Sequence, residues 1–209
     1  MKSKKGGTDT VMKYLLIYSH PNPLSFCNAI VNTVREELWE KKHELIIRDL
    51  YGIGFDPVLK ASDFIARQAG QTPADIKIEQ DYVVWSDVMI FIYPIWWAAL
   101  PAMIKGYIDR VISYGFAYKR DAGGNVIPLL TGKKVIVFNT QGAPEERYEK
   151  SGMFEAMRKT SDFAIFEFCG MQVLAHQFFG AVTTVDEATR KLYLKKVDTT
   201  MNQLPAGQG

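Results

Sequence analysis

Three segments of the chain carry residue types that are suited to hold a ligand. They are 20–28 (HPNPLSFCN), 94–101 (PIWWAALP) and 139–148 (NTQGAPEERY). In the first, Ser25 is suited to cap a helix whose free N–H groups and positive dipole end attract a phosphate, and His20 adds a donor. In the second, the rings of Trp96 and Trp97 are suited to pack along a planar heteroaromatic while excluding water. In the third, Gly142 lets backbone N–H groups approach negative charge on such a ring.

Each segment also has a plain structural alternative. Ser25 and His20 could serve only a helix cap and a turn, Gly142 could be an ordinary turn residue, and Ile95, Trp96 and Trp97 could be core packing. The glycine patterns of a dinucleotide-binding fold and of a P-loop are both absent from the sequence. Taken together, one phosphate cradle and two ring-binding loops predict a planar cofactor that bears a phosphate. Flavin mononucleotide (FMN) fits that description best.

The apolar pattern predicts the elements that position these segments. Short apolar runs predict strands at 14–18, 45–47, 88–93, 133–140 and 173–178, and Pro94 is expected to end the third. Helices are expected after Ser25, at 63–70, 73–86, after Pro101, at 152–169 and at 186–201, with a hairpin within 116–130. This alternation predicts an α/β fold: a flavodoxin-like, doubly wound, five-stranded parallel sheet of order 2-1-3-4-5 with helices on both faces. All three ligand-binding segments would then lie at one edge of the sheet.

Length and composition set the outer limits. The 209 residues suit one domain, expected at 13–203, between a disordered leader (1–12) and a frayed tail (204–209). A net charge of +2 gives no reason to expect a nucleic acid or an acidic membrane as a partner. Cys27 and Cys169 lack metal-ligand spacing, and no segment is long and apolar enough to be inserted in a membrane. A cytoplasmic enzyme without a metal site is expected.

Five motifs carry a family resemblance that covers the chain from Tyr14 to about Lys196. They are HPNPLSF at 20–26, P-x-x-W-x-x-x-P-A-x-x-K-G at 94–106, DRVISYGFAY at 109–118, NTQG at 139–142 and FCGMQVL at 168–174. In this order and spacing, the chain resembles the flavodoxin-like NAD(P)H:quinone oxidoreductases. That group contains DT-diaphorase and the shorter bacterial flavin reductases associated with glutathione-gated potassium efflux.

The resemblance implies a role for each matching residue. The flavin phosphate would be held by His20, Ser25, Phe26 and the backbone near Cys27 and Asn28. The isoalloxazine would lie beside Pro94, Ile95, Trp96, Trp97 and Ala98, with Thr140, Gln141 and Gly142 at its pyrimidine edge. Tyr118 and Phe168 match residues that line the quinone pocket, which the family shares across a homodimer interface. The implied reaction is ping-pong: NAD(P)H gives a hydride to the flavin, and a quinone then takes two electrons at the same site.

The chain departs from the family pattern at several positions. Tyr148 matches, with a shift of one residue, a tyrosine proposed to assist proton transfer, but the loop after the fourth strand has no histidine. Arg120 stands where an aromatic pocket residue is expected. FMN is favoured over FAD because the segment 62–75 is short, although Arg190 could match an adenosine contact.

Two alternatives to quinone reduction remain open from the sequence. One keeps the flavin and changes the acceptor to azo or nitro compounds. The other is a regulatory flavoprotein that docks on a transporter as an ancillary subunit.

Overall fold

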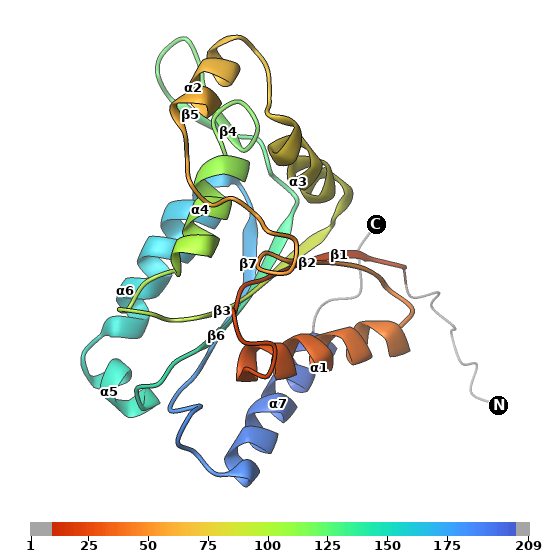
Figure 1. The fold of residues 1–209 in the computed structure, drawn as a ribbon, viewed down its shortest axis with the longest axis vertical. Helices are drawn as coiled ribbons and strands as arrows, with labels where there is room; N and C mark the ends of the chain where they lie inside the picture. The colour runs from red at the N-terminus through yellow and green to blue at the C-terminus, as the bar shows by residue number, and fades with distance from the viewer. Residues whose placement is uncertain (1–9, 204–209) are drawn as a thin grey trace, which may run out of the picture.

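A computed structural model, which describes residues 10–203, has a five-stranded parallel sheet at its centre (Figure 1). Its order is β2-β1-β3-β6-β7, which is the predicted order 2-1-3-4-5 once the separate hairpin is left out of the count. The strands are β1 (Lys13–Tyr18), β2 (Glu44–Asp49), β3 (Val88–Pro94), β6 (Lys134–Thr140) and β7 (Gln172–Phe179). The predicted flavodoxin-like topology is confirmed.

Helices cover both faces of the sheet, because its central strands are apolar on both sides. All seven residues of β3 are buried. One face packs against α1 (Phe26–Glu40) and α7 (Glu187–Asn202), which lie side by side in Figure 1. The other face packs against α3 (Ala74–Trp85), α4 (Ala102–Val111) and the helical segment before β7. This double cover fixes the positions of the strand ends from which the ligand-binding segments depart.

The third strand ends at Pro94, as predicted. Pro94 forms the last pair of the ladder, in register with Thr140 at the end of β6. The next residue continues the link, since the N–H of Ile95 donates to the carbonyl of Thr140 at 2.7 Å. A proline is tolerated there because its missing N–H coincides with the last rung of the strand. The second and third segments therefore leave the sheet from hydrogen-bonded neighbours.

The predicted helix over 152–169 is helical throughout but is not one α-helix. Gly152 adopts a left-handed φ of 70° and precedes α6 (Met153–Arg158), after which η1 (Lys159–Phe166) is a π-helix and η2 (Glu167–Cys169) a 3-10 helix. The expected loop 141–148 likewise contains the start of a short helix, α5 (Glu145–Lys150). A π-helix widens the helical turn, and apolar periodicity does not reveal it in advance.

The remaining elements lie away from the centre of the sheet. They are α2 (Ala61–Gln68) and the hairpin of β4 (Tyr118–Arg120) and β5 (Val126–Pro128), as predicted within 116–130. Figure 1 places both at the opposite end of the molecule from α1. The predicted tail (204–209) and residues 1–9 of the predicted leader lie outside the described residues. Within residues 10–203, no helix has the length and apolarity needed to cross a membrane.

Candidate functional site

The first segment ends in a capped helix N-terminus, as the sequence predicted. Ser25 has an extended backbone, and its hydroxyl accepts a hydrogen bond from the N–H of Asn28 at 3.3 Å. The side-chain amide of Asn28 also donates, through Nδ2, to the carbonyl of Pro23 at 2.6 Å, and this bond closes the turn. Among residues 10–203, the N–H of Phe26 has no hydrogen-bond partner, and the N–H of Cys27 contacts only its own thiol. Unpaired N–H groups in the first turn of a helix are the arrangement that binds phosphate.

A cavity of about 360 Å³ lies at this helix end. It brings together four residues predicted for the site: His20, Ser25, Phe26 and Thr140. It also includes Arg190, whose guanidinium donates to the carbonyls of Val182 and Val185. The cavity therefore combines a free helix N–H group, a hydroxyl and a guanidinium, all of which are donors suited to an anionic group.

The His20 side chain is fixed by its own turn. Its Nδ1 lies 3.0 Å from the backbone nitrogen and 3.2 Å from the carbonyl oxygen of Asn22, so both contacts hold the ring within the turn. Burial lowers the pKa of His20, while its contact with the backbone of Asn22 opposes that shift. The imidazole ring also lies edge-on to the ring of Trp96, with centroids 6.1 Å apart. His20 therefore links the first segment to the second.

The second segment is an exposed, strained loop rather than core packing. Trp97 is fully exposed and Trp96 is 43 % exposed, whereas Ile95 is buried with Met157 and Phe178. Trp97 and Ala98 both adopt left-handed conformations, with φ of 53° and 56°. Such values are unfavourable for residues that carry a Cβ and are concentrated at functional sites. The two tryptophans are therefore not part of the core of this chain, whereas Ile95 is buried.

The third segment presents backbone and a buried amide. The side chain of Gln141 is held by its Nε2, which donates to the carbonyl of Ala143 at 3.1 Å. Gly142 is exposed, and nothing lies within 4 Å of the position that a Cβ would take there. Thr140 is buried, and its hydroxyl lies 3.1 Å from the thiol of Cys27. That contact joins the end of β6 to the first turn of α1.

The residues at this edge of the sheet fit a flavin, because two of their buried polar atoms have no hydrogen-bond partner within the protein. Three buried side-chain atoms in residues 10–203 lack a partner: Ser19 Oγ, Tyr107 OH and Gln141 Oε1. Two of the three belong to residues at the carboxyl edge of the sheet, just after β1 and β6. Burying a polar atom without a partner costs about 1–3 kcal/mol, so such atoms are expected where a polar ligand supplies the missing bond. A flavin carries both the phosphate and the ring-edge donors and acceptors that this edge requires.

The residues predicted to line the acceptor pocket form a separate cluster. The rings of Tyr118 and Phe168 lie edge-to-face with centroids 5.0 Å apart, and Tyr114 contacts Tyr118 in the same way at 5.7 Å. Phe168 is 40 % exposed. Neither Tyr118 nor Phe168 lines the cavity at the N-terminus of α1, and Figure 1 shows β4 at the other end of the molecule. A single chain therefore does not bring the two predicted parts of the site together.

Tyr148, the predicted catalytic residue, lies on α5 and is partly buried. Its ring packs edge-to-face against Phe154 at 5.7 Å, next to the small apolar cluster that contains Ile95. Arg120, by contrast, lies at the surface of the hairpin, where its guanidinium donates to the carbonyl of Gly124. This contact matches the solvated hairpin charge that is the common fate of an arginine.

Sequence reasoning missed one histidine. His176, on β7, is buried between Asp162 and Asn139, at 2.8 Å from a carboxylate oxygen and 2.7 Å from the amide oxygen. No motif marked it, because its partners come from η1 and β6, at separations of 14 and 37 residues. The only signal available was a histidine within a mostly apolar strand.

The two cysteines are free, buried thiols. Burial raises the pKa of Cys27 to about 12 and that of Cys169 to about 11. Neither thiol is ionised near neutral pH, so neither is suited to act as a nucleophile.

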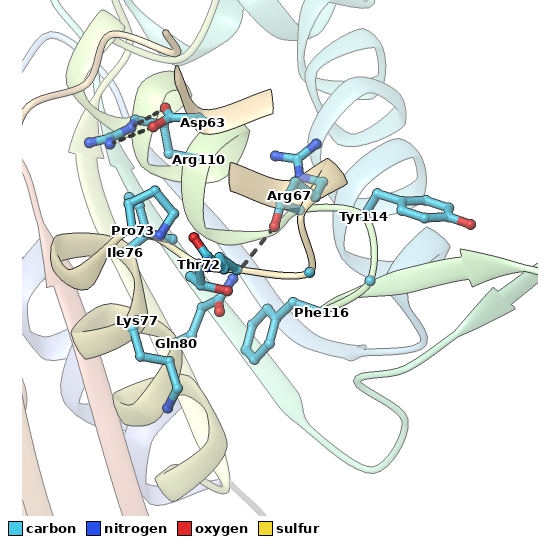
Figure 2. A pocket seen from close by; sticks show the side chains of 14 residues that line it. Asp63, Arg67, Thr72, Pro73, Ile76, Lys77, Gln80, Arg110, Tyr114 and Phe116 are labelled. Atoms are coloured by element: carbon cyan, nitrogen blue, oxygen red, sulfur yellow. Dashed lines mark hydrogen bonds and ion pairs between the residues drawn. The ribbon is translucent and has the colours of Figure 1, made fainter. Parts of the chain in front are cut away.

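A second cavity, also of about 360 Å³, lies beyond the C-terminus of α4 (Figure 2). Its buried arginine is already paired, because Arg110 contacts Asp63 at 2.8 Å and Asp75 at 2.7 Å. Figure 2 shows the Arg110–Asp63 pair on one side of the opening, with Phe116 and Tyr114 on the other. The pairing explains these residues as a brace between α2, α3 and α4.

Known proteins share this architecture along almost the whole chain. A relative from Haemophilus influenzae named "Uncharacterized NAD(P)H oxidoreductase" is 34% identical over 185 residues, covering 88% of this chain and 91% of its own. The human protein named "Ribosyldihydronicotinamide dehydrogenase [quinone]" is 30% identical over 203 residues, covering 86% of each chain.

The solved structure named "NAD(P)H:quinone oxidoreductase from Methanothermobacter marburgensis" superposes with a TM-score of 0.82 at 25% identity, covering 96% of this chain and 99% of its own. A family model described as "Flavodoxin-like fold" matches residues 12–201. The chain therefore belongs to the flavodoxin-like fold family, as its motifs and its sheet order indicated.

Proposed function

We propose that the protein is a flavin-dependent NAD(P)H dehydrogenase that reduces quinones by two electrons. The observation that carries this proposal is the convergence of the three segments at the carboxyl edge of one parallel sheet. There the capped N-terminus of α1 opens into a cavity, and beside it Trp96 and Trp97 are exposed. Parallel α/β sheets bind their ligands at this edge. The names of the relatives, which include an NAD(P)H oxidoreductase and quinone dehydrogenases, support the same activity.

In this proposal each group of residues has a distinct task. The N–H of Phe26, the backbone near Cys27, the Ser25 hydroxyl and the His20 side chain hold the phosphate. Trp97 covers the ring and keeps water away from it, beside the backbone of Pro94 to Ala98. Gln141 and the backbone at Thr140 and Gly142 bind the pyrimidine edge. A bound flavin would supply the hydride-accepting chemistry, and the protein would orient it and stabilise negative charge at its edge.

A homodimer would complete the site. Tyr118, which is partly buried, and Phe168, which is 40 % exposed, form an aromatic pair outside the cavity at the N-terminus of α1. The same pair on a second copy would cover the exposed Trp97 and form the acceptor pocket. Sedimentation equilibrium tests this proposal: a dimer that dissociates on Tyr118→Glu supports it, and a wild-type monomer with full activity contradicts it.

FMN is the proposed flavin, with FAD as the alternative. Arg190 lines the phosphate cavity, where a single phosphate and the first phosphate of FAD would make the same contact. Mass spectrometry of the flavin released by heating decides between them. A mass of FMN supports the proposal, and a mass of FAD replaces it with the alternative.

Steady-state kinetics test the activity itself. We expect oxidation of NADH or NADPH by quinones in a cytoplasmic enzyme, with the parallel double-reciprocal plots of a ping-pong mechanism. An acceptor panel of quinones, azo dyes and nitroaromatics separates the main proposal from its closest alternative, since faster turnover of azo or nitro compounds would make those the physiological class. Co-purification with a membrane transporter, without turnover of NAD(P)H, would favour the role of an ancillary subunit.

A further inference from the structure

A buried network of hydrogen-bonded polar side chains lies directly behind the proposed ring-binding loops. It runs from Asp162 on η1, through His176 on β7, to Asn139 on β6. Asn139 then reaches the third strand, where its Nδ2 donates to the carbonyl of Tyr93 at 3.2 Å. The side chain of His176 is 3 % exposed and that of Asp162 is 11 % exposed. Four elements meet in it, and of its residues only Asn139 falls within a predicted segment, 139–148.

Hydrogen bonding fixes the direction of the link. Since the amide nitrogen of Asn139 donates to Tyr93, its oxygen is the atom that faces His176, so Nε2 must carry a proton. The other ring nitrogen, Nδ1, lies 2.8 and 3.0 Å from the two carboxylate oxygens of Asp162. Burial lowers the pKa of His176, while the hydrogen bond and the negative charge of Asp162 at Nδ1 oppose that shift. His176 therefore connects two acceptors and is held in place from both sides.

The network lies next to the proposed flavin site in the sequence and in the sheet. Asn139 directly precedes Thr140 and Gln141, and Tyr93 directly precedes Pro94 and Ile95. The two strand ends pair in register, so a bond from Asn139 to Tyr93 holds together the points from which both loops leave the sheet. Packing reinforces the contact, because the His176 ring stacks on Phe178 at 4.2 Å, and Phe178 packs with Ile95.

The π-helix η1 supplies Asp162, the outer residue of the network. Asp162 lies within η1, where the wider helical turn is of the kind that recurs at functional sites. The hydroxyl of the adjacent Ser161 lies 2.7 Å from the same carboxylate oxygen that faces His176. Asp162 is therefore oriented by its own element before it meets the histidine.

We infer that Asn139, His176 and Asp162 are positioning residues for the flavin site. They hold the ends of β3 and β6 at the spacing that allows the loops after Pro94 and Thr140 to bind the isoalloxazine ring. This inference rests on the proposed flavin site. It assigns no contact between these three residues and the flavin, and their effect passes through the backbone of the two loops.

Substitutions that separate hydrogen bonding from charge test the inference. Asn139→Ala and His176→Leu break the link and should weaken FMN binding by about tenfold or more, as expected when a buried polar partner is left unpaired. Asp162→Asn removes the charge but offers an N–H to Nδ1, so the link to Asn139 survives. It should bind FMN within about twofold of the wild type, whereas Asp162→Leu should bind it as weakly as His176→Leu.

A matched control removes a buried amide at a different place. Gln80 is 5 % exposed and joins α3 to the end of α4 by donating to the carbonyl of Val111 at 3.0 Å. Gln80→Met should lower the thermal unfolding midpoint as Asn139→Ala does while leaving FMN affinity unchanged. All dissociation constants come from quenching of flavin fluorescence, which needs no turnover, and the comparison of Asp162→Asn with Asp162→Leu stands alone if His176→Leu does not fold.

The inference is overturned if Asn139→Ala and His176→Leu bind FMN as tightly as the wild type, or if the two Asp162 variants are equally weak. If the wild-type protein itself binds neither FMN nor FAD, the proposed function fails, and that result is distinct from a change confined to the variants.

Discussion

Replacing Trp97 with Ala separates the ligand-binding role of this residue from a structural one. The side chain is fully exposed in the chain and contributes nothing to the core. Alanine also carries a Cβ, so the left-handed φ of 53° is equally unfavourable before and after the change. We therefore expect the free energy of unfolding to change by less than about 0.5 kcal/mol, as for an ordinary surface substitution.

The loss in flavin affinity should be much larger. A tryptophan side chain has about 150–250 Å² of surface, of which a ring stacked on one face covers roughly 100 Å². At about 25 cal/mol per Å² this area contributes up to ~2.5 kcal/mol, or roughly 50- to 100-fold in the dissociation constant. The assay is a fluorescence titration of flavin-free protein with FMN, next to chemical denaturation of the same samples.

Trp39→Ala is the matched control for this prediction. Trp39 is also a highly exposed tryptophan, on α1, and it does not line the phosphate cavity. It should leave both stability and FMN affinity unchanged. Equal FMN affinity in the wild type and in Trp97→Ala would refute the reasoning, and so would an equal loss in both tryptophan variants.

Three further predictions follow from the first segment and the thiols. Ser25→Ala removes the side-chain cap on the N–H of Asn28 and should lower stability by ~1 kcal/mol and weaken FMN binding. Its control is Ser86→Ala, which removes a buried hydroxyl just before β3 and should affect stability alone. Burial lowers the pKa of His20, so its stabilising contribution is complete above 6.5, the ordinary pKa, and is lost as pH falls below it; denaturation curves of His20→Gln should lack that part of the pH dependence. Because burial raises the pKa of Cys27 to about 12, the folded protein should react slowly with iodoacetamide at pH 8, and rapid labelling of Cys27 would contradict its burial.

The fold was predictable because its central strands can be recognised as continuous apolar runs. Runs such as 88–93 and 133–140 are apolar without alternation, which is typical of strands covered on both faces, and helical spacing separates them. Pro94, which lacks an N–H to donate, marked the end of the third strand correctly. The change from α-helix to π-helix after Arg158 had no such marker.

The candidate site was predictable in part, for a physical reason. Ser25 and Trp97 lie in segments whose local chemistry is unusual, so their positions followed from the sequence and the sheet topology. His176 was missed because its role depends on partners from two other elements, and the π-helix that presents Asp162 has no signature in the apolar spacing. Long-range polar contacts of this kind become visible only when the strands are placed side by side.

Titration of flavin-free protein with FMN and FAD tests the central claim most directly. The account predicts saturable binding of one flavin per chain, with quenched flavin fluorescence, and weaker binding in Trp97→Ala. The absence of saturable binding with both flavins would contradict it.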